Sequence, residues 1–169
     1  MDAAHDRIEA FPWPNPSLHV ALVEPEIPPN TGNIARLCAA TGTVLHLVGQ
    51  LGFRLSDKSL KRAGLDYWDS VHMVRHNTFD AFRETVAPAQ MFFFSARGRH
   101  LYTRAAYRPG DVLIFGNERT GLPADILAAH EDRVYTIPMK KEAVRSLNLA
   151  TSVGIVLYEA LRQSASGQL

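Results

Sequence analysis

The stretch LHVALVEPEIPPNTGNIARLCAATG, residues 18–42, contains the two patterns that decide the fold class. Its first six residues form a short apolar run, which predicts a strand. A proline-rich turn follows, and side chains then recur at i, i+3, i+4 and i+7, as on one face of a helix: Ile34, Leu37, Cys38 and Thr41. Asn30 or Thr31 is the expected cap of this helix, and Gly42 is its expected stop.

The same alternation continues along the chain. Further strands are predicted at residues 44–48, 70–74, 91–95, 112–115 and 134–137. The predicted helices are a short polar one from Ser56, one capped by Thr78 with Phe79, Phe82 and Val86 inward, one with Pro123 in its first turn, and a last one from about Ser146 to Gln163. Strands that alternate with helices are typical of a parallel sheet covered by helices, so we expect an α/β fold.

The apolar positions of the last predicted helix form a stripe too broad for one-sided burial: Leu149, Val153, Val156, Leu157 and Ala160. We therefore expect this helix to be buried on two sides, with a second subunit as one candidate partner.

Length and composition fit one domain. The chain has 169 residues, 46% of them hydrophobic, which is enough for one good core. Three prolines within residues 11–16 prevent a helix there, so we expect residues 1–16 to form an arm outside the fold and residues 17–169 to form a single domain.

Charge and cysteine content exclude several classes of protein. The 18 basic and 17 acidic residues nearly cancel, so any nucleic-acid site must come from local clustering of basic residues. Candidates in or near predicted loops are Lys58, Lys61, Arg62, Arg97, Arg99, Arg104, Arg108, Lys140 and Lys141, although each one alone is most often a solvated charge. The single cysteine excludes a disulfide framework and a zinc site of several cysteines.

Metal and membrane readings find no support in the sequence. His46, His72 and His100 are too scattered to nominate as metal ligands, so core or surface roles are expected for them. No apolar run approaches the roughly 18 residues that span a bilayer. Residues 1–10 are polar rather than signal-like, and we expect a soluble, cytoplasmic protein.

Common ligand-binding signatures are absent: there is no G-x-G-x-x-G after a strand, no P-loop, no H-E-x-x-H and no G-x-S-x-G. Open α/β sheets bind ligands at the carboxyl ends of their strands, so the loops at that edge are the candidate site. The first of these loops, residues 24–36, reads equally well as a capped strand-to-helix turn or as an anion site, with Arg36 adding a guanidinium.

The second loop, residues 115–123, can be read as a turn that uses Gly116 and Gly121 for their permissive dihedrals. A turn does not require Asn117, Glu118 and Arg119 together, however, and a glycine at the end of a strand lets a ligand approach the backbone closely. We favour a binding site over a simple turn.

The third loop, residues 137–148, can be read as a solvated basic loop with Ser146 or Asn148 near a helix cap. Alternatively, Ile137, Met139 and Leu147 could form an apolar wall for an adenosine-like ligand. The neighbouring lysines and Arg145 could then hold a phosphate backbone.

Taken in order, these motifs resemble the SPOUT (SpoU–TrmD) methyltransferases. The matching segments are NTGNIAR at 30–36, FGNERTGLP at 115–123, IPM at 137–139, RSLNL at 145–149 and VLYEA at 156–160. The chain is most similar to the minimal branch of that family, the tRNA (cytidine/uridine) wobble-position ribose 2'-O-methyltransferases, over about residues 18–163.

The resemblance implies a parallel α/β fold with a C-terminal deep trefoil knot, and a homodimer whose active sites are each built from both subunits. It implies methyl transfer from S-adenosyl-L-methionine, leaving S-adenosyl-L-homocysteine, to the ribose 2'-hydroxyl of a wobble cytidine or cmnm5-uridine. The expected substrate is the anticodon loop of tRNA, with leucine isoacceptors favoured. The methyl already sits on a sulfonium, so no metal and no covalent enzyme intermediate are required.

The resemblance also assigns roles to residues of this chain. The implied cofactor-binding residues are Phe94, Gly116, Glu118, Ile137, Met139, Ser146, Leu147 and Asn148. The implied substrate-binding residues are Asn33, Arg145 and Tyr158, the last two on the tRNA and dimer surface. Arg36 would be the catalytic residue facing the ribose, and because arginine stays protonated, orientation and charge stabilisation suit it better than general-base catalysis.

Two features depart from the family pattern. Asn117 stands where similar proteins often have proline, and the loop from Met139 to Ser146 is one residue longer than usual. Alternative functions are ribose methylation at another tRNA or rRNA site, and RNA binding without catalysis. Relatives that methylate rRNA or other tRNA sites often contain an additional RNA-binding domain, for which this chain is too short, so the minimal wobble-position branch is favoured.

Overall fold

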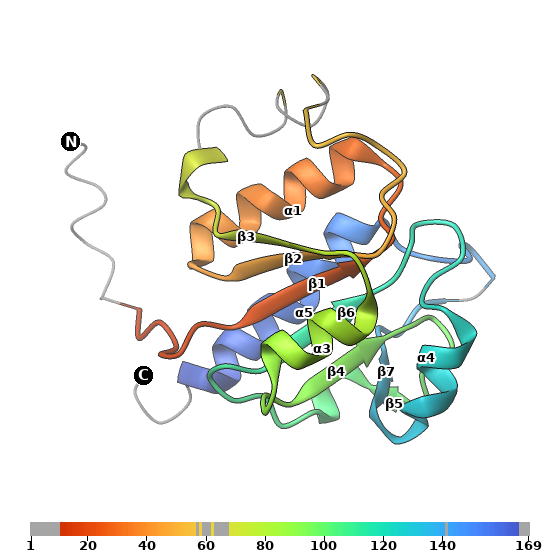
Figure 1. Ribbon diagram of the computed structural model, residues 1–169. Helices are drawn as coiled ribbons and strands as arrows, with labels where there is room; N and C mark the ends of the chain where they lie inside the picture. The colour runs from red at the N-terminus through yellow and green to blue at the C-terminus, as the bar shows by residue number, and fades with distance from the viewer. Residues whose placement is uncertain (1–10, 57, 59–61, 63–67, 141, 166–169) are drawn as a thin grey trace.

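A computed structural model describes residues 11–56, 58, 62, 68–140 and 142–165. Within them, seven strands form one parallel sheet in the order β3-β2-β1-β6-β4-β7-β5 (Figure 1). The strands are β1 His19–Val23, β2 Val44–Val48, β3 Met73–His76, β4 Met91–Phe94, β5 His100–Leu101, β6 Val112–Phe115 and β7 Val134–Thr136. The predicted parallel α/β fold is therefore confirmed.

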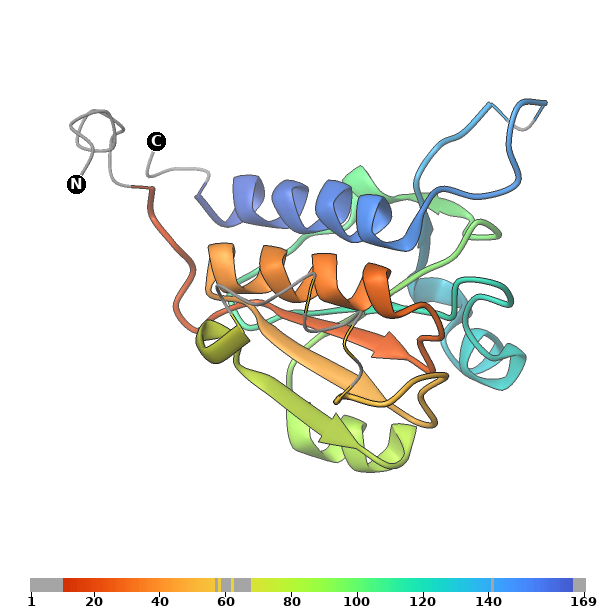
Figure 2. The ribbon, with the colours of Figure 1, turned by 90° about the horizontal axis from the view of Figure 1, so that it is seen from above.

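Helices cover both faces of this sheet. They are α1 Pro28–Thr41, α3 Phe79–Val86, α4 Ala124–Ala129 and α5 Leu149–Ala165, with 3-10 turns η2 Trp68–Ser70, η3 Tyr102–Arg104 and η4 Glu131–Arg133. Figure 2 shows α1 and α5 side by side on one face, with α3 on the other. No helix in the described part of the chain is long and apolar enough to cross a membrane.

The sheet is buried on both faces, which explains its continuous apolar runs. Along β1, Val20 and Leu22 pack into the core beneath α1 and α5, whereas Ala21 and Val23 pack into the core beneath α3 and α4. The predicted strands at 44–48 and 112–115 have the observed bounds, and those at 91–95 and 134–137 each end one residue early.

Three predicted boundaries were wrong. The strand expected at 70–74 begins at Met73, because residues 68–70 form η2 and the pairing with β2 starts at Leu45 and Met73. The first helix begins at Pro28 with Ile27 as its cap, since proline is well tolerated at the first helical position. The last helix begins at Leu149, and Ser146 lies in the preceding loop.

Other predictions had mixed outcomes. The Thr78 cap is confirmed, because its side chain accepts a hydrogen bond from the backbone N–H of Ala81 at 3.1 Å. Pro123 is the cap of α4 rather than part of its first turn. The helix expected from Ser56 falls largely outside the described residues.

Strand β5 was not predicted, because its two residues are exposed and give no apolar run. Part of the predicted arm does contact the fold: Phe11 packs against the core, whereas Trp13 is 51% exposed. Residues 1–10 of the predicted arm lie outside the described residues.

Candidate active site

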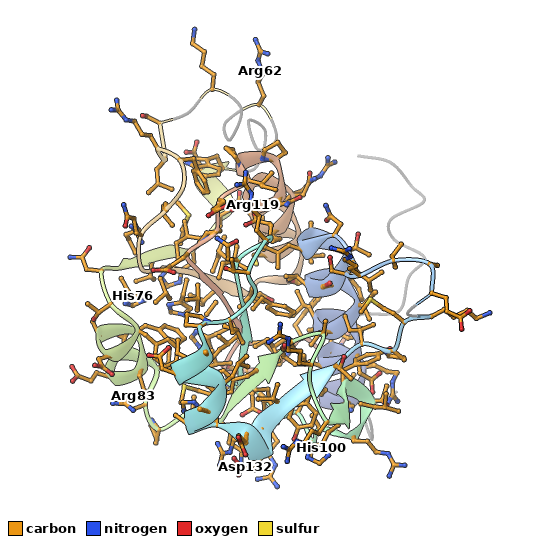
Figure 3. The ribbon with its side chains drawn as sticks, turned by 90° about the vertical axis from the view of Figure 1, so that its right-hand side faces the viewer. Arg62, His76, Arg83, His100, Arg119 and Asp132 are labelled. Atoms are coloured by element: carbon orange, nitrogen blue, oxygen red, sulfur yellow. The ribbon has the colours of Figure 1, made fainter. Side chains whose placement is uncertain are left out.

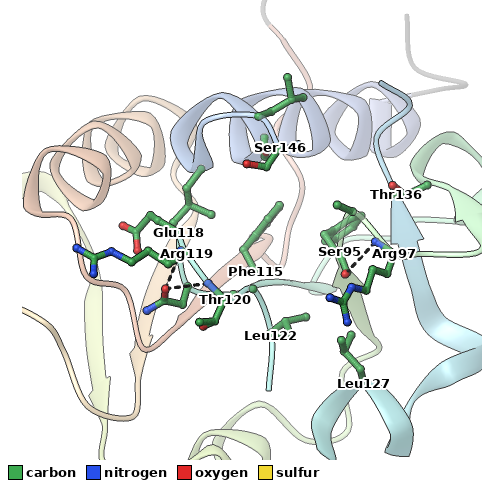
Figure 4. Close-up of a pocket in the computed structure, with 18 of the residues that line it drawn as sticks. Ser95, Arg97, Phe115, Glu118, Arg119, Thr120, Leu122, Leu127, Thr136 and Ser146 are labelled. Atoms are coloured by element: carbon green, nitrogen blue, oxygen red, sulfur yellow. Dashed lines mark hydrogen bonds between the residues drawn. The ribbon is translucent and has the colours of Figure 1, made fainter. Parts of the chain in front are cut away.

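A cavity of about 680 Å³ lies at the carboxyl edge of the sheet (Figure 4). The segments that follow β4, β6 and β7 enclose it, together with the first turns of α4 and α5. This is the edge at which open α/β folds bind ligands. The size falls within the range of small-molecule sites, which is roughly 300–1,000 Å³.

The cavity combines apolar walls with a few polar groups. Phe94 and Phe115 stack at a centroid distance of 4.9 Å and an interplanar angle of 18°, and both line the cavity. Further apolar lining comes from Leu122, Ile137, Met139, Leu147 and Leu149, and polar lining from Ser95, Thr136 and Ser146. Such a lining suits a ligand with a flat apolar ring and several hydrogen-bonding groups.

The loop after β6 is held by a tight internal turn. Asn117 and Gly121 exchange two backbone hydrogen bonds, of 3.1 and 2.9 Å, and the Asn117 side chain accepts from the backbone N–H of Arg119 at 2.8 Å. A Cβ on Gly116 would lie 2.1 Å from the carbonyl carbon of Gly121. The two readings of this loop are therefore compatible, because a glycine-dependent turn also forms one wall of the cavity.

Glu118 ties this loop to the beginning of α1. Its carboxylate accepts hydrogen bonds from the backbone N–H groups of Glu26 at 2.8 Å and Ile27 at 3.0 Å. These donors precede the helix, where a negative charge also interacts favourably with the helix dipole. The carboxylate therefore stabilises the site's frame as well as lining the cavity.

Asn30 joins all three predicted loops. Its side-chain N–H donates to Glu118 at 3.4 Å, and its side-chain oxygen accepts from Asn148 at 3.0 Å. Asn148 in turn accepts from the backbone N–H of Thr151 at 3.2 Å, which caps α5 as one reading of the sequence proposed. Asn30, at the centre of this Glu118–Asn30–Asn148 network, is only 7% exposed, whereas Glu118 is half-buried and Asn148 is exposed.

The structure brings together most of the residues predicted to bind cofactor. Those that line the cavity are Phe94, Gly116, Glu118, Ile137, Met139, Ser146 and Leu147. Asn148 does not line the cavity; it is exposed and donates a hydrogen bond to Asn30. Arg145, predicted for the tRNA surface, also lines the cavity.

Three predicted residues do not line the cavity of their own chain. Asn33 and Arg36 are exposed on α1, and Tyr158 is 54% exposed on α5. Sequence reasoning also missed Asn30 and Ser95 as site residues, and it named Arg97, which lines the cavity, only among nine basic candidates for RNA binding. The signal for Asn30 was its position in the turn before an apolar helix, which was read only as a capping role.

Outside the cavity, three histidines form a row across neighbouring strands. Nδ1 of His19 lies 2.8 Å from Nε2 of His46, and Nδ1 of His46 lies 2.9 Å from Nε2 of His76. Of these three, only His46 was named from the sequence; the row forms because diagonal positions on β1, β2 and β3 meet on one face. The expected core role of His46 is confirmed, and the described residues contain no cluster suited to a metal ion.

Burial changes the titration of this row. Desolvation lowers the pKa of His46 to about 3, with further lowering by the neighbouring His19, His76 and His72. The pKa values of His19 and His76 are also lowered, in each case mainly by desolvation. The row is therefore a neutral, hydrogen-bonded part of the core at physiological pH.

Comparison with known proteins gives consistent similarities. The model of the SpoU rRNA Methylase family matches residues 17–158. The tRNA (cytidine(34)-2'-O)-methyltransferase of Escherichia coli (strain K12) is 46% identical, over 86% of this chain and 93% of that protein. The protein of the same name from Burkholderia ambifaria is 49% identical, over 86% of this chain and 95% of that protein.

Solved structures agree with these relatives. One, described as "Structural insights into the 2-OH methylation of C/U34 on tRNA", has a TM-score of 0.82 and 51% identity, covering 86% of this chain and 95% of that one. An AdoMet-bound rRNA methyltransferase from Sinorhizobium meliloti has a TM-score of 0.75 and 34% identity, covering 86% of this chain and 56% of that one.

Proposed function

The chain belongs to the SpoU methylase family, and from that premise we propose that it is a tRNA (cytidine(34)-2'-O)-methyltransferase. It transfers a methyl group from S-adenosyl-L-methionine to the ribose 2'-hydroxyl of the wobble nucleotide. The observation that carries this proposal is the convergence of three motif loops on one cavity, joined by the Glu118–Asn30–Asn148 network. The relatives from Escherichia coli and Burkholderia ambifaria are named for the methylation of cytidine 34 of tRNA.

The cavity residues fit the proposed cofactor. Phe94, Ile137 and Leu147 supply apolar surface for an adenine ring, and Ser146 and Thr136 supply hydrogen-bonding groups. The bound cofactor supplies an electrophilic methyl on a sulfonium. The protein's own task is to exclude water, to fix the ligand's orientation and to place the hydroxyl oxygen in line with that methyl.

We assign the orientation of the hydroxyl to Arg36. Its guanidinium would hold the ribose and its neighbouring phosphate and stabilise the charge that develops on the oxygen. Because Arg36 does not line the cavity of its own chain, the proposal includes a homodimer in which Arg36 of the partner subunit reaches that cavity. Exposed apolar groups on the α1 and α5 side, Ile27 at 37% and Tyr158 at 54%, support a subunit contact there.

The family fold also includes a deep trefoil knot, and we extend that proposal to this chain. In support, the chain leaves β7 near one edge of the sheet and returns over the cavity to pack α5 against α1 and β6. The bond between Asn148 and Asn30 fixes the point of return.

The proposed function is tested with the purified protein and tRNA. Calorimetry should show binding of S-adenosyl-L-methionine, and radiolabelled methyl should enter bulk tRNA, with leucine isoacceptors among the substrates. Mapping should place the methyl on the wobble ribose. Methylation at a different tRNA or rRNA position, or cofactor-free RNA binding without transfer, would instead support one of the alternative functions.

Arg36→Ala tests the catalytic assignment. We expect the methylation rate to fall by about 100-fold or more, as when a group that stabilises transition-state charge is removed. Cofactor affinity should stay unchanged, and Arg36→Lys should recover only part of the rate because it lacks the planar fork. Full methylation rate with unchanged tRNA affinity would exclude Arg36 from this role.

A further inference from the structure

The turn after β4 separates the cavity from a second, smaller hollow of about 300 Å³. Ser95, Arg97, Ala124 and Leu127 line both spaces, so the two adjoin. Arg99 and the acidic Glu131 line only the smaller hollow. Arg97 therefore lies at the border, beside a second arginine two residues further along.

The backbone that presents Arg97 is firmly held. The backbone N–H of Ser95 donates to the carbonyl of Tyr135 at 3.0 Å, and that of Gly98 donates to the carbonyl of Ser95 at 3.0 Å. The backbone N–H of Arg97 donates to the hydroxyl oxygen of Ser95 at 3.1 Å. A Cβ on Gly98 would lie 2.4 Å from the carbonyl carbon of Tyr135, so the turn packs directly against β7. Its position is fixed before any ligand arrives.

The charged group of Arg97 is uncommitted within the described part of the chain. Arg119, another cation of the cavity wall, pairs with Glu26 at 3.3 Å, and the Glu118 carboxylate is occupied by the beginning of α1. Arg97 forms no ion pair with any described residue, and its side chain is exposed. Figure 4 shows its guanidinium directed into the space beside Leu127.

We propose that Arg97, supported by Arg99, binds a backbone phosphate of the tRNA strand next to the nucleotide that is methylated. This inference rests on the proposed function. A guanidinium matches the geometry of a phosphate with two parallel hydrogen bonds, and such contacts fix the register of a nucleic acid without reading its sequence. Arg97 is thus a positioning residue that sets where the ribose hydroxyl lies relative to the cavity.

An RNA phosphate fits this place better than the carboxylate of the cofactor. Arg97 is exposed where the two spaces adjoin, and Arg99 lines the smaller hollow beside it. The cofactor does not need this hollow, because the main cavity already has a volume of about 680 Å³. Two neighbouring cations suit a polyanion that arrives from solvent. Glu131, which also lines the smaller hollow, limits the attraction for anions that make no contact with the arginine fork.

Arg97→Ala, Arg97→Lys and the charge-matched control Arg83→Ala test this proposal with the full-length protein. Arg83 lies on α3, outside both spaces and away from Arg119 in Figure 3. For Arg97→Ala we expect the KM for tRNA to rise about tenfold and the slope of log affinity against log salt to fall by about 0.7, the value for one single-strand phosphate contact. Affinity for S-adenosyl-L-methionine, measured by calorimetry, should not change.

The remaining results distinguish the possible failures. Arg97→Lys should retain part of the tRNA affinity, and Arg83→Ala should match the wild type in every measurement. Weaker cofactor binding with unchanged tRNA binding would overturn the proposal in favour of a carboxylate contact, and an Arg97→Ala variant equal to the wild type would overturn it outright. If the wild type itself transfers no methyl to tRNA, the proposed function fails, whereas tRNA binding by the variants still tests the phosphate contact.

Discussion

Lowering the pH from 7.5 to 5.0 should destabilise the folded protein through His46. This ring is 2% exposed, and it is hydrogen-bonded to His19 and His76 on either side. Phe82 covers it at a centroid distance of 5.3 Å. A proton added to His46 would place a charge in an apolar core without a carboxylate partner among the groups that shift its pKa.

The sign and size follow from the pKa difference between the folded and unfolded states. The folded-state pKa of His46 is about 3, against 6.5 for the ordinary group. Below pH 6.5, His46 binds a proton in the unfolded chain but stays neutral in the folded chain, so the free energy of unfolding decreases as the pH falls. At pH 5.0 the folded ring is still neutral, and the loss is about 1.4 kcal/mol for each of the 1.5 units below 6.5, or about 2 kcal/mol.

Urea denaturation at a fixed protein concentration, followed by circular dichroism at both pH values, measures this loss. About 2 kcal/mol corresponds to a fall in Tm of about 4–8 °C for a chain of this length. His46→Gln keeps one donor and one acceptor but cannot titrate, so its loss between the two pH values should be smaller by about 2 kcal/mol. His100→Gln, on the exposed strand β5 at a distance from His76 in Figure 3, is the matched control and should behave as the wild type.

A particular outcome would refute this reasoning. If His46→Gln lost as much stability between pH 7.5 and 5.0 as the wild type, the lowered pKa of His46 would not be the cause of the loss. A residual slope in the variant is expected, because burial also lowers the pKa values of His19 and His76.

Three further substitutions follow from the geometry of the site. Gly116→Ala should unfold the loop after β6 and abolish cofactor binding in calorimetry, because its Cβ would lie 2.1 Å from a backbone carbon; normal affinity would show that the loop can move aside. Gly154→Ala, whose Cβ would meet only one atom at 3.9 Å, should keep full affinity and raise stability by up to about 1 kcal/mol in urea denaturation. Asn30→Ala should cost about 1 kcal/mol in the same measurement, because it removes the hydrogen bonds to the half-buried Glu118 and the exposed Asn148. A loss below about 0.5 kcal/mol, typical of surface sites, would mean that water replaces the network.

Features with a local cause were predictable from the sequence. The apolar runs of β2 and β6 gave their observed bounds because a strand buried on both faces needs apolar residues throughout. Thr78 was recognisable as a cap because its partner lies only three residues away. The proposed cofactor-binding residues came from the family resemblance rather than from periodicity, and the structure gathers most of them around one cavity.

Features that depend on distant partners were not predictable. Asn30 looked like a helix cap, yet its partners lie 88 and 118 residues away in the sequence. The row of His19, His46 and His76 was not predicted, because nothing in their spacing reveals that their strands are neighbours. Arg97 stood among nine basic candidates, and only the turn packed against β7 distinguishes it from the others.

The α/β class and the three loops at the sheet edge could be recognised from the sequence alone, and the family resemblance indicated the chemistry to expect of these loops. Helical and strand periodicity, proline turns and glycines act over a few neighbouring residues, so they can be recognised in the sequence alone. The tertiary structure alone decided the sheet order, in which β6 lies between β1 and β4. That order brings the loops after these strands side by side at one edge, where they line the cavity. The physical reason is that burial of both sheet faces selects strand neighbours by packing across the whole chain, irrespective of their distance in sequence.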